Sequence, residues 1–285
     1  MRIGAHVSAA GGLDKAIDRA VDIGAETLQL FCSPPQGWAF KPIDPDVANI
    51  FREKALKNNI KPVFLHGVYL VNLGTEIPLN LEKGVESLTN YMSVASSIGA
   101  AGVVFHPGSH KGRGYDAVFE QTVASITEIL ERSPGDTHLI LENMAGMGNH
   151  IGAKFDQIGQ IIKGVGSPRL KVCMDVQHAF AAGYDLATPD GIEQTMEEFD
   201  RKIGVSRLFA VHANDSKTVF SSGVDRHENI GHGYIGIQGF EVIMGHPAFL
   251  DIPFLLEVPG FEGNGPDRYN VETLKEIRER VGVSR

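Results

Sequence analysis

Short apolar runs alternate with longer amphipathic stretches along the whole chain. Each short run is rich in β-branched or aliphatic residues and is bounded by polar residues or glycine, which is typical of a buried strand. The expected strands are residues 2–6, 27–32, 61–66, 102–107, 137–143, 170–175, 207–215 and 252–258. The stretches between them place apolar residues at helical spacing. The expected helices are residues 14–23, 47–59, 81–98, 117–132, 155–163, 192–203, 238–244 and 271–281.

This regular alternation predicts a parallel α/β fold. Eight strands that alternate with eight helices favour a closed (β/α)8 barrel, the TIM barrel, over an open sheet. A length of 285 residues suits a single barrel. No linker, low-complexity tract or charge block divides the sequence, so we expect one domain over residues 1–285.

Composition bears on where the protein works. No run of about 18 apolar residues occurs, so no membrane span is expected. The first residues lack the charged and apolar regions of a signal peptide. The two cysteines, Cys32 and Cys173, lie on apolar strands and fit a reducing compartment. We therefore expect a cytoplasmic protein.

Metal-type side chains stand at the ends of successive strands. In chain order they are His66, His106, Glu142, Asp175, His212 and Glu257. One such residue alone is usually a cap or a turn former, but the C-terminal ends of barrel strands meet at one mouth, where barrel enzymes build their active sites. Buried carboxylates and imidazoles need a cation or protons in order to coexist. The series therefore predicts a metal centre.

The ligand types narrow the choice of metal. Imidazole with carboxylate, and no thiolate, favours Zn, Mn or Fe over Ca or Mg. The set exceeds one tetrahedral site and so suggests at least two metals. His178 lies in the segment expected to be the loop after the sixth strand, and Asp225 and His227 lie in the loop after the seventh. Because these loops would be adjacent, we expect the three residues to form a third site.

The net charge of the chain bears on whether it binds nucleic acid. The chain carries −9 at pH 7, which argues against a nucleic-acid partner. Bound divalent cations can reverse the sign of a site, however. A nucleic-acid partner is therefore compatible with an acidic chain if the acidic residues are gathered around metals.

Several longer motifs carry a resemblance to a known family. They are IGAHVSAAGG, LHGVYLVNLG, FHPGSH, LEN-AG, DVQHAFAAGYD, HANDSK, VDRH and LLE, and they span nearly the whole chain. Together they resemble the endonuclease IV family of apurinic/apyrimidinic endonucleases. The resemblance implies a TIM barrel with three zinc ions. The implied ligands fall into three sets: His66, His106 and Glu142; Asp175, His212 and Glu257, with Glu142 shared; and His178, Asp225 and His227.

The resemblance also implies a reaction and a partner. The reaction would hydrolyse the phosphodiester 5′ to an abasic site in duplex DNA, leaving a 3′-hydroxyl and a 5′-deoxyribose phosphate, and would extend to 3′-blocked ends. Glu142 would be catalytic, orienting or deprotonating water. The expected DNA contacts are Tyr69, Gln36, Trp38, His6, His110 and Arg226. Gln36 stands where family members have Arg, so the wedge at the lesion lacks a charge. A monomer is expected, because DNA needs the open mouth.

Two alternatives remain open on the sequence alone. A metal-dependent sugar or sugar-phosphate isomerase or epimerase could use the same barrel, with fewer metals and no need for Tyr69 or the segment Asp225-Arg226-His227. A metal-stabilised DNA-binding protein without turnover is the other. A full set of ligands around open sites argues against it, because structural zinc sites are usually closed by four protein ligands.

Overall fold

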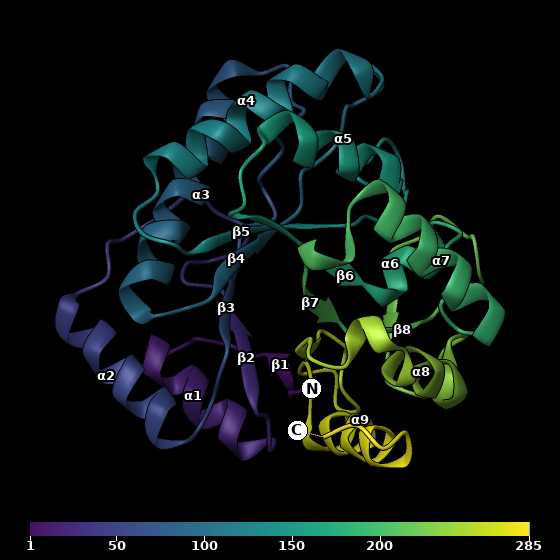
Figure 1. Ribbon diagram of the computed structural model, residues 1–285. Helices are drawn as coiled ribbons and strands as arrows, with labels where there is room; N and C mark the ends of the chain where they lie inside the picture. Colours follow the sequence, from purple (N-terminus) through teal and green to yellow (C-terminus); the bar gives the residue numbers. More distant parts are fainter. Residues whose placement is uncertain (285) are drawn as a thin grey trace.

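The chain forms a closed parallel barrel surrounded by helices (Figure 1). A computed structural model describes residues 1–284. Around the barrel the strands follow the order β1-β10-β7-β6-β5-β4-β3-β2. Their bounds are β1 (Ile3–His6), β2 (Thr27–Leu30), β3 (Val63–His66), β4 (Gly102–Phe105), β5 (His138–Glu142), β6 (Leu170–Asp175), β7 (Leu208–His212) and β10 (Phe254–Leu256). The TIM barrel that the alternation predicted is confirmed.

Helices surround the strands of the barrel (Figure 1). They are α1 (Leu13–Asp22), α2 (Pro45–Lys57), α3 (Pro78–Ile98), α4 (Asp116–Arg132), α5 (Phe155–Val165), α6 (Val176–Ala181), α7 (Pro189–Lys202), α8 (Gly236–Gly245) and α9 (Arg268–Arg280). Proline opens α2, α3 and α7, where its fixed φ suits the first turn and no hydrogen bond is lost. Side chains cap several helices: Asp267, for example, accepts a hydrogen bond from the backbone N–H of Asn270 at the start of α9.

The structure differs from the sequence-based expectations in three places. The segment after β6 is the short helix α6, not a loop, so His178 lies on a helix. The strand expected over residues 207–215 ends at His212. Beyond it, β8 (Asp215–Ser216) pairs antiparallel with β9 (His227–Glu228), a hairpin that was not expected. All six residues of α6 are buried, and each hairpin strand has two residues, so none of these elements shows the periodicity that identifies a longer one.

Inside the barrel a small apolar cluster fills the space between the strands. We call it the plug; its buried members are Phe64, Val104, Ile140, Cys173, Ala210 and Leu255. All of them are fully buried. The remaining core lies mainly between the strands and the surrounding helices. The plug therefore forms the floor on which the next layer of inward-facing side chains rests.

No helix within residues 1–284 is both long enough and apolar enough to cross a membrane.

Candidate metal centre

The strand-end residues converge directly above the plug. Because side chains alternate along a strand, a residue two positions beyond a plug residue points the same way. The pairs are Phe64 and His66, Val104 and His106, Ile140 and Glu142, Cys173 and Asp175, Ala210 and His212, and Leu255 and Glu257. His106 and Glu257 stand one residue past the ends of their strands. The structure thus brings together the whole predicted ring.

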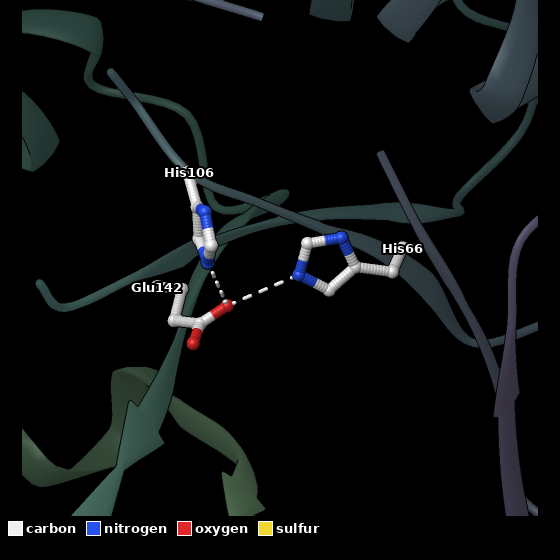
Figure 2. A group of neighbouring side chains, drawn as sticks. All are labelled: His66, His106 and Glu142. Atoms are coloured by element: carbon white, nitrogen blue, oxygen red, sulfur yellow. Dashed lines mark hydrogen bonds and ion pairs between the residues drawn. The ribbon is translucent and has the colours of Figure 1, made fainter. Parts of the chain in front are cut away.

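Glu142 lies at the centre of this ring and has no exposed surface. Its Oε2 is 3.2 Å from His66 Nε2 and 3.0 Å from His106 Nε2. Figure 2 marks both contacts with dashed lines. Its Oε1 is 3.0 Å from His212 Nδ1 and 3.3 Å from His178 Nδ1. One carboxylate therefore faces imidazoles with both oxygens, as a ligand shared between two cations would.

Potential ligand atoms fall into three groups, and within each group they lie within 4.8 Å of one another. The groups are His66, His106 and Glu142; Glu142, Asp175, His212 and Glu257; and Asp175, His178 and His227. Glu142 and Asp175 each belong to two groups, so the centre is continuous. Asp225, which the resemblance placed with His178 and His227, borders the third group: its carboxylate oxygens are 3.2 Å from His178 Nε2 and 3.5 Å from His227 Nε2.

Two buried nitrogen atoms in the third group have no hydrogen-bond partner: Nε2 of His178 and Nε2 of His227. Asp225 is within ion-pair distance of both, but neither contact has hydrogen-bond geometry. A buried polar atom left without a partner is costly. Lone pairs that converge on one point without bonding each other suit a cation between them. The donor atoms of this centre therefore fit divalent metal ions.

Hydrogen bonds on the outer side of the rings fix their orientation. His66 Nδ1 lies 2.8 Å from the backbone carbonyl of Gly67, and His178 Nδ1 lies 2.9 Å from that of Asn143. A carbonyl oxygen accepts only, so each Nδ1 carries a proton and each Nε2 is the nitrogen left for a cation at the centre. Metal-binding histidines are usually oriented by such a contact.

Two asparagines that the sequence analysis did not single out hold the Asp175 segment. Asn143 accepts from the backbone N–H of Asp175 at 2.7 Å. Asn214 donates to Asp175 Oδ2 at 2.7 Å and accepts from the backbone N–H of Glu257 at 2.8 Å. Both follow strand-end ligands in the motifs LEN and HAND. Asparagine is so common in turns that this position alone did not distinguish them.

Asp215 orders the loop that follows the hairpin. Its buried carboxylate accepts hydrogen bonds from the backbone N–H groups of Gly231, Gly233, Ile235 and Gly236, at 2.9 to 3.3 Å. A Cβ at Gly233 would collide with this carboxylate, so glycine is required there. Because β8 pairs Ser216 with His227, the same segment also fixes a predicted ligand.

Opposite charges compensate one another within the centre. Burial raises the pKa of Glu142, but the imidazoles of His212 and His106 outweigh burial and hold this pKa well below its usual range. Burial likewise acts to raise the pKa of Asp225, but the contact with His178 brings it to about 2. Burial lowers the pKa of His178, whereas Asp175, Asp225 and Glu142 outweigh it and raise this pKa well above normal. Without metal His178 therefore favours its protonated form, and a cation that bound its nitrogen would displace the proton.

Of the expected DNA contacts, Tyr69 lies at the mouth. Its side chain is exposed, and its ring centroid is 5.9 Å from that of His66 and 6.2 Å from that of His106. Its backbone N–H donates to Pro35 O at 3.0 Å, which joins it to the loop after β2. In that loop Gln36 is exposed and Trp38 is half-buried against the core.

The other expected contacts lie in different settings. His6 Nδ1 is 3.1 Å from Glu257 Oε1, so His6 touches a predicted ligand. His110 is half-buried, and its Nδ1 accepts from the backbone N–H of Gly114 at 3.2 Å. Arg226 is exposed and donates to the carbonyl of Asp225 at 2.6 Å. His110 thus closes a local turn, whereas Arg226 lies at the surface, where it can meet a ligand.

Comparisons with known proteins identify the family. A family model described as a xylose isomerase-like TIM barrel matches residues 17–280. The probable endonuclease 4 of Halothermothrix orenii is 40% identical over 276 residues, covering 96% of this chain and 99% of the relative. The chain belongs to the endonuclease IV family. The resemblance in the sequence motifs is thereby confirmed.

Solved structures agree with this membership. Endonuclease IV from Thermus thermophilus superposes with a TM-score of 0.87 at 32% identity, covering 98% of this chain and 100% of that one. A D-tagatose 3-epimerase-like protein superposes with a TM-score of 0.74 at 20% identity, covering 99% and 98% of the two chains. The second likeness shows a shared fold alone, whereas the first places the fold within the endonuclease IV family.

Proposed function

We propose that this protein is a metal-dependent apurinic/apyrimidinic endonuclease of base excision DNA repair. It hydrolyses the phosphodiester 5′ to an abasic site, leaving a 3′-hydroxyl and a 5′-deoxyribose phosphate, and removes 3′-blocking groups by the same chemistry. The observation that carries the proposal is the continuous run of donor groups at the barrel mouth, joined through Glu142 and Asp175, in an endonuclease IV family chain.

The proposed cofactor is three zinc ions per chain, with Mn or Fe able to replace one. The proposed ligand sets are His66, His106 and Glu142; Glu142, Asp175, His212 and Glu257; and His178, Asp225 and His227, with Asp175 beside the last set. When bound, neighbouring divalent cations activate water for attack and stabilise the attacking and leaving oxygens at phosphorus. Three dications would outweigh the carboxylates among these ligands. The mouth would then attract a phosphodiester although the chain carries −9.

The side chains of this protein prepare the site for that reaction. Glu142 presents both carboxylate oxygens to the imidazoles around it and orients the attacking water. Asn143 and Asn214 hold Asp175 in register with the β10 end. Tyr69, exposed beside the centre, contacts DNA at the lesion. Gln36, Trp38, His6, His110 and Arg226 are the further proposed DNA contacts.

We also propose three wider properties of the protein. Residues 1–285 make up one endonuclease domain, the protein acts as a monomer because duplex DNA needs an open mouth, and it works in the cytoplasm. The alternative of a sugar isomerase or epimerase is less favoured, because the third donor group exceeds what such a reaction needs.

A duplex carrying a single tetrahydrofuran abasic analogue tests the proposal, assayed with and without chelator beside elemental analysis of the protein. We expect a nick on the 5′ side of the analogue, loss of that nick on chelation, and about three metals per chain. The undamaged duplex of the same sequence is the control. Bound metals without a nick would favour the isomerase. The absence of both bound metal and a nick would overturn the proposal.

A further inference from the structure

A buried glutamine lies against the metal centre although no ligand set includes it. Gln29 is in the middle of β2, between Leu28 and Leu30, and has no exposed surface. A buried amide needs partners for both its nitrogen and its oxygen. Two of the three partners of Gln29 prove to be predicted ligands.

The Gln29 side chain bridges two strands of the barrel mouth. Its Nε2 donates to Glu257 Oε1 at 2.6 Å, and it lies 3.0 Å from His6 Nδ1. Its Oε1 lies 2.9 Å from His212 Nε2. One short side chain therefore contacts two predicted ligands and a histidine that itself touches Glu257.

The chemistry of these groups settles which atom faces which. An ionised carboxylate only accepts hydrogen bonds, so the amide nitrogen of Gln29 must point to Glu257. This leaves the amide oxygen facing His212. That oxygen also only accepts, so the proton of His212 must be on Nε2. Nδ1, which lies 3.0 Å from Glu142 Oε1 and 3.3 Å from Glu257 Oε2, is then the nitrogen that a bound cation would use.

His212 thus differs from its neighbours. His66 and His178 carry their proton on Nδ1 and turn Nε2 to the centre, and backbone carbonyls set that choice. For His212 the choice is reversed, and a side chain sets it. Among these three histidines, only His212 therefore depends for its orientation on a group that substitution can remove.

We propose that Gln29 is a positioning residue of the metal centre. Its amide oxygen selects the tautomer of His212 that presents Nδ1, and its amide nitrogen holds Glu257 Oε1, which leaves Oε2 facing His212. The inference rests on the ligand assignment in the proposed function. It does not require that the bound metals cleave DNA.

The tautomer of His212 tests the inference in the unaltered protein. We would label the zinc-loaded protein with 15N-histidine and record long-range 1H–15N correlation spectra, which report the nitrogen that carries the proton. His212 should be protonated on Nε2, and His66 and His178 on Nδ1. A proton on Nδ1 of His212 would overturn the inference even in a fully active enzyme.

Metal affinity tests the consequence. Gln29→Met keeps the length of the side chain and removes both hydrogen bonds. Loss of such a supporting contact typically weakens metal binding about 10–100-fold. Equilibrium dialysis against graded concentrations of a chelator should show this shift for part of the bound metal. If Gln29→Met and the unaltered protein keep the same amount of metal at every chelator concentration, the positioning role is rejected.

Thr27→Val provides the matched control. Thr27 is fully buried two residues earlier on the same strand, and its hydroxyl donates to Pro62 O at 2.6 Å. This variant also loses a buried hydrogen bond but contacts no predicted ligand. It should lower the melting temperature without changing metal retention. Equal loss of metal in both variants would mean that Gln29 acts through general stability, which contradicts the inference. Because none of these measurements uses DNA, failure of the proposed cleavage would be seen separately.

Discussion

The plug and the layer above it are carried by the same strands, two residues apart, yet they are opposite in chemistry. The plug is apolar and buried, and each larger side chain in it contributes about 1.5–3 kcal/mol through burial. The layer above places buried carboxylates against imidazoles, and it is tolerable only because the opposite charges compensate. Stability and chemistry are thus assigned to adjacent layers of one barrel. If that division holds, each layer can be changed with little effect on the other.

Glu142→Gln should have the largest effect. Glutamine keeps the shape of the side chain, but its amide nitrogen cannot act as a ligand and would face imidazole nitrogens. Loss of a contact that only supports a metal ligand typically lowers metal affinity or activity about 10–100-fold. Because Glu142 is itself a proposed ligand, we expect cleavage of the abasic duplex to fall at least about 100-fold. Circular dichroism should show an unchanged fold. Glu86→Gln, an exposed change on α3, is the control. Near-normal cleavage by Glu142→Gln would remove Glu142 from the mechanism.

Ile140→Ala makes the converse change, in the plug directly beneath Glu142. The lost contacts and the cavity should lower the free energy of unfolding by about 2–5 kcal/mol, measured by urea denaturation. Because Ile140 is not itself a ligand and belongs to the layer below, the folded fraction should keep its full metal content. Metal loss from folded Ile140→Ala protein would show that the two layers are coupled, and would contradict the division proposed above.

Tyr69→Ala tests an exposed side chain at the edge of the layer above the plug. Loss of an aromatic ring that stacks on a base or sugar typically costs about 1–3 kcal/mol, so we expect KM for the abasic duplex to rise about tenfold. Metal content should not change, because the exposed ring lies beside the histidines and is not a ligand. Tyr69→Phe, which keeps the ring, should behave like the unaltered protein. An unchanged KM in Tyr69→Ala would remove Tyr69 from the DNA interface.

The smallest effect should be seen with thiol reagents. Burial raises the pKa of Cys173, in the plug, to about 11, and that of Cys32 to about 12. Only the thiolate reacts, and at pH 8 a thiol of pKa 11 is about 0.1% ionised. Ellman's reagent should therefore leave both cysteines unmodified until the protein unfolds, with or without chelator. Rapid modification of Cys173 after chelation would show that the plug opens when the upper layer loses its metals.

The sequence predicted the barrel and the ring of strand ends because both depend on local patterns. Alternating apolar runs mark the strands, and a ligand at the end of a run such as LILE is visible without knowing its neighbours. What supports the ligands could not be found in this way. Gln29 and Glu257 are 228 residues apart, and only the closed barrel brings them together. Likewise α6 depends on the Asp175 carboxylate, whose Oδ1 accepts from the backbone N–H of His178 at 2.7 Å.

The carboxylate of Asp215 has a consequence for binding as well as for structure. Fixing the backbone of a residue costs about 1–2 kcal/mol in conformational entropy. Asp215 already orders the loop over residues 231–236 in the folded protein, so a substrate does not have to meet that cost when it binds. The same contacts commit the backbone amides of the loop to an internal anion. Although the GHGYIG segment is rich in glycine, these amides are not available to a DNA phosphate.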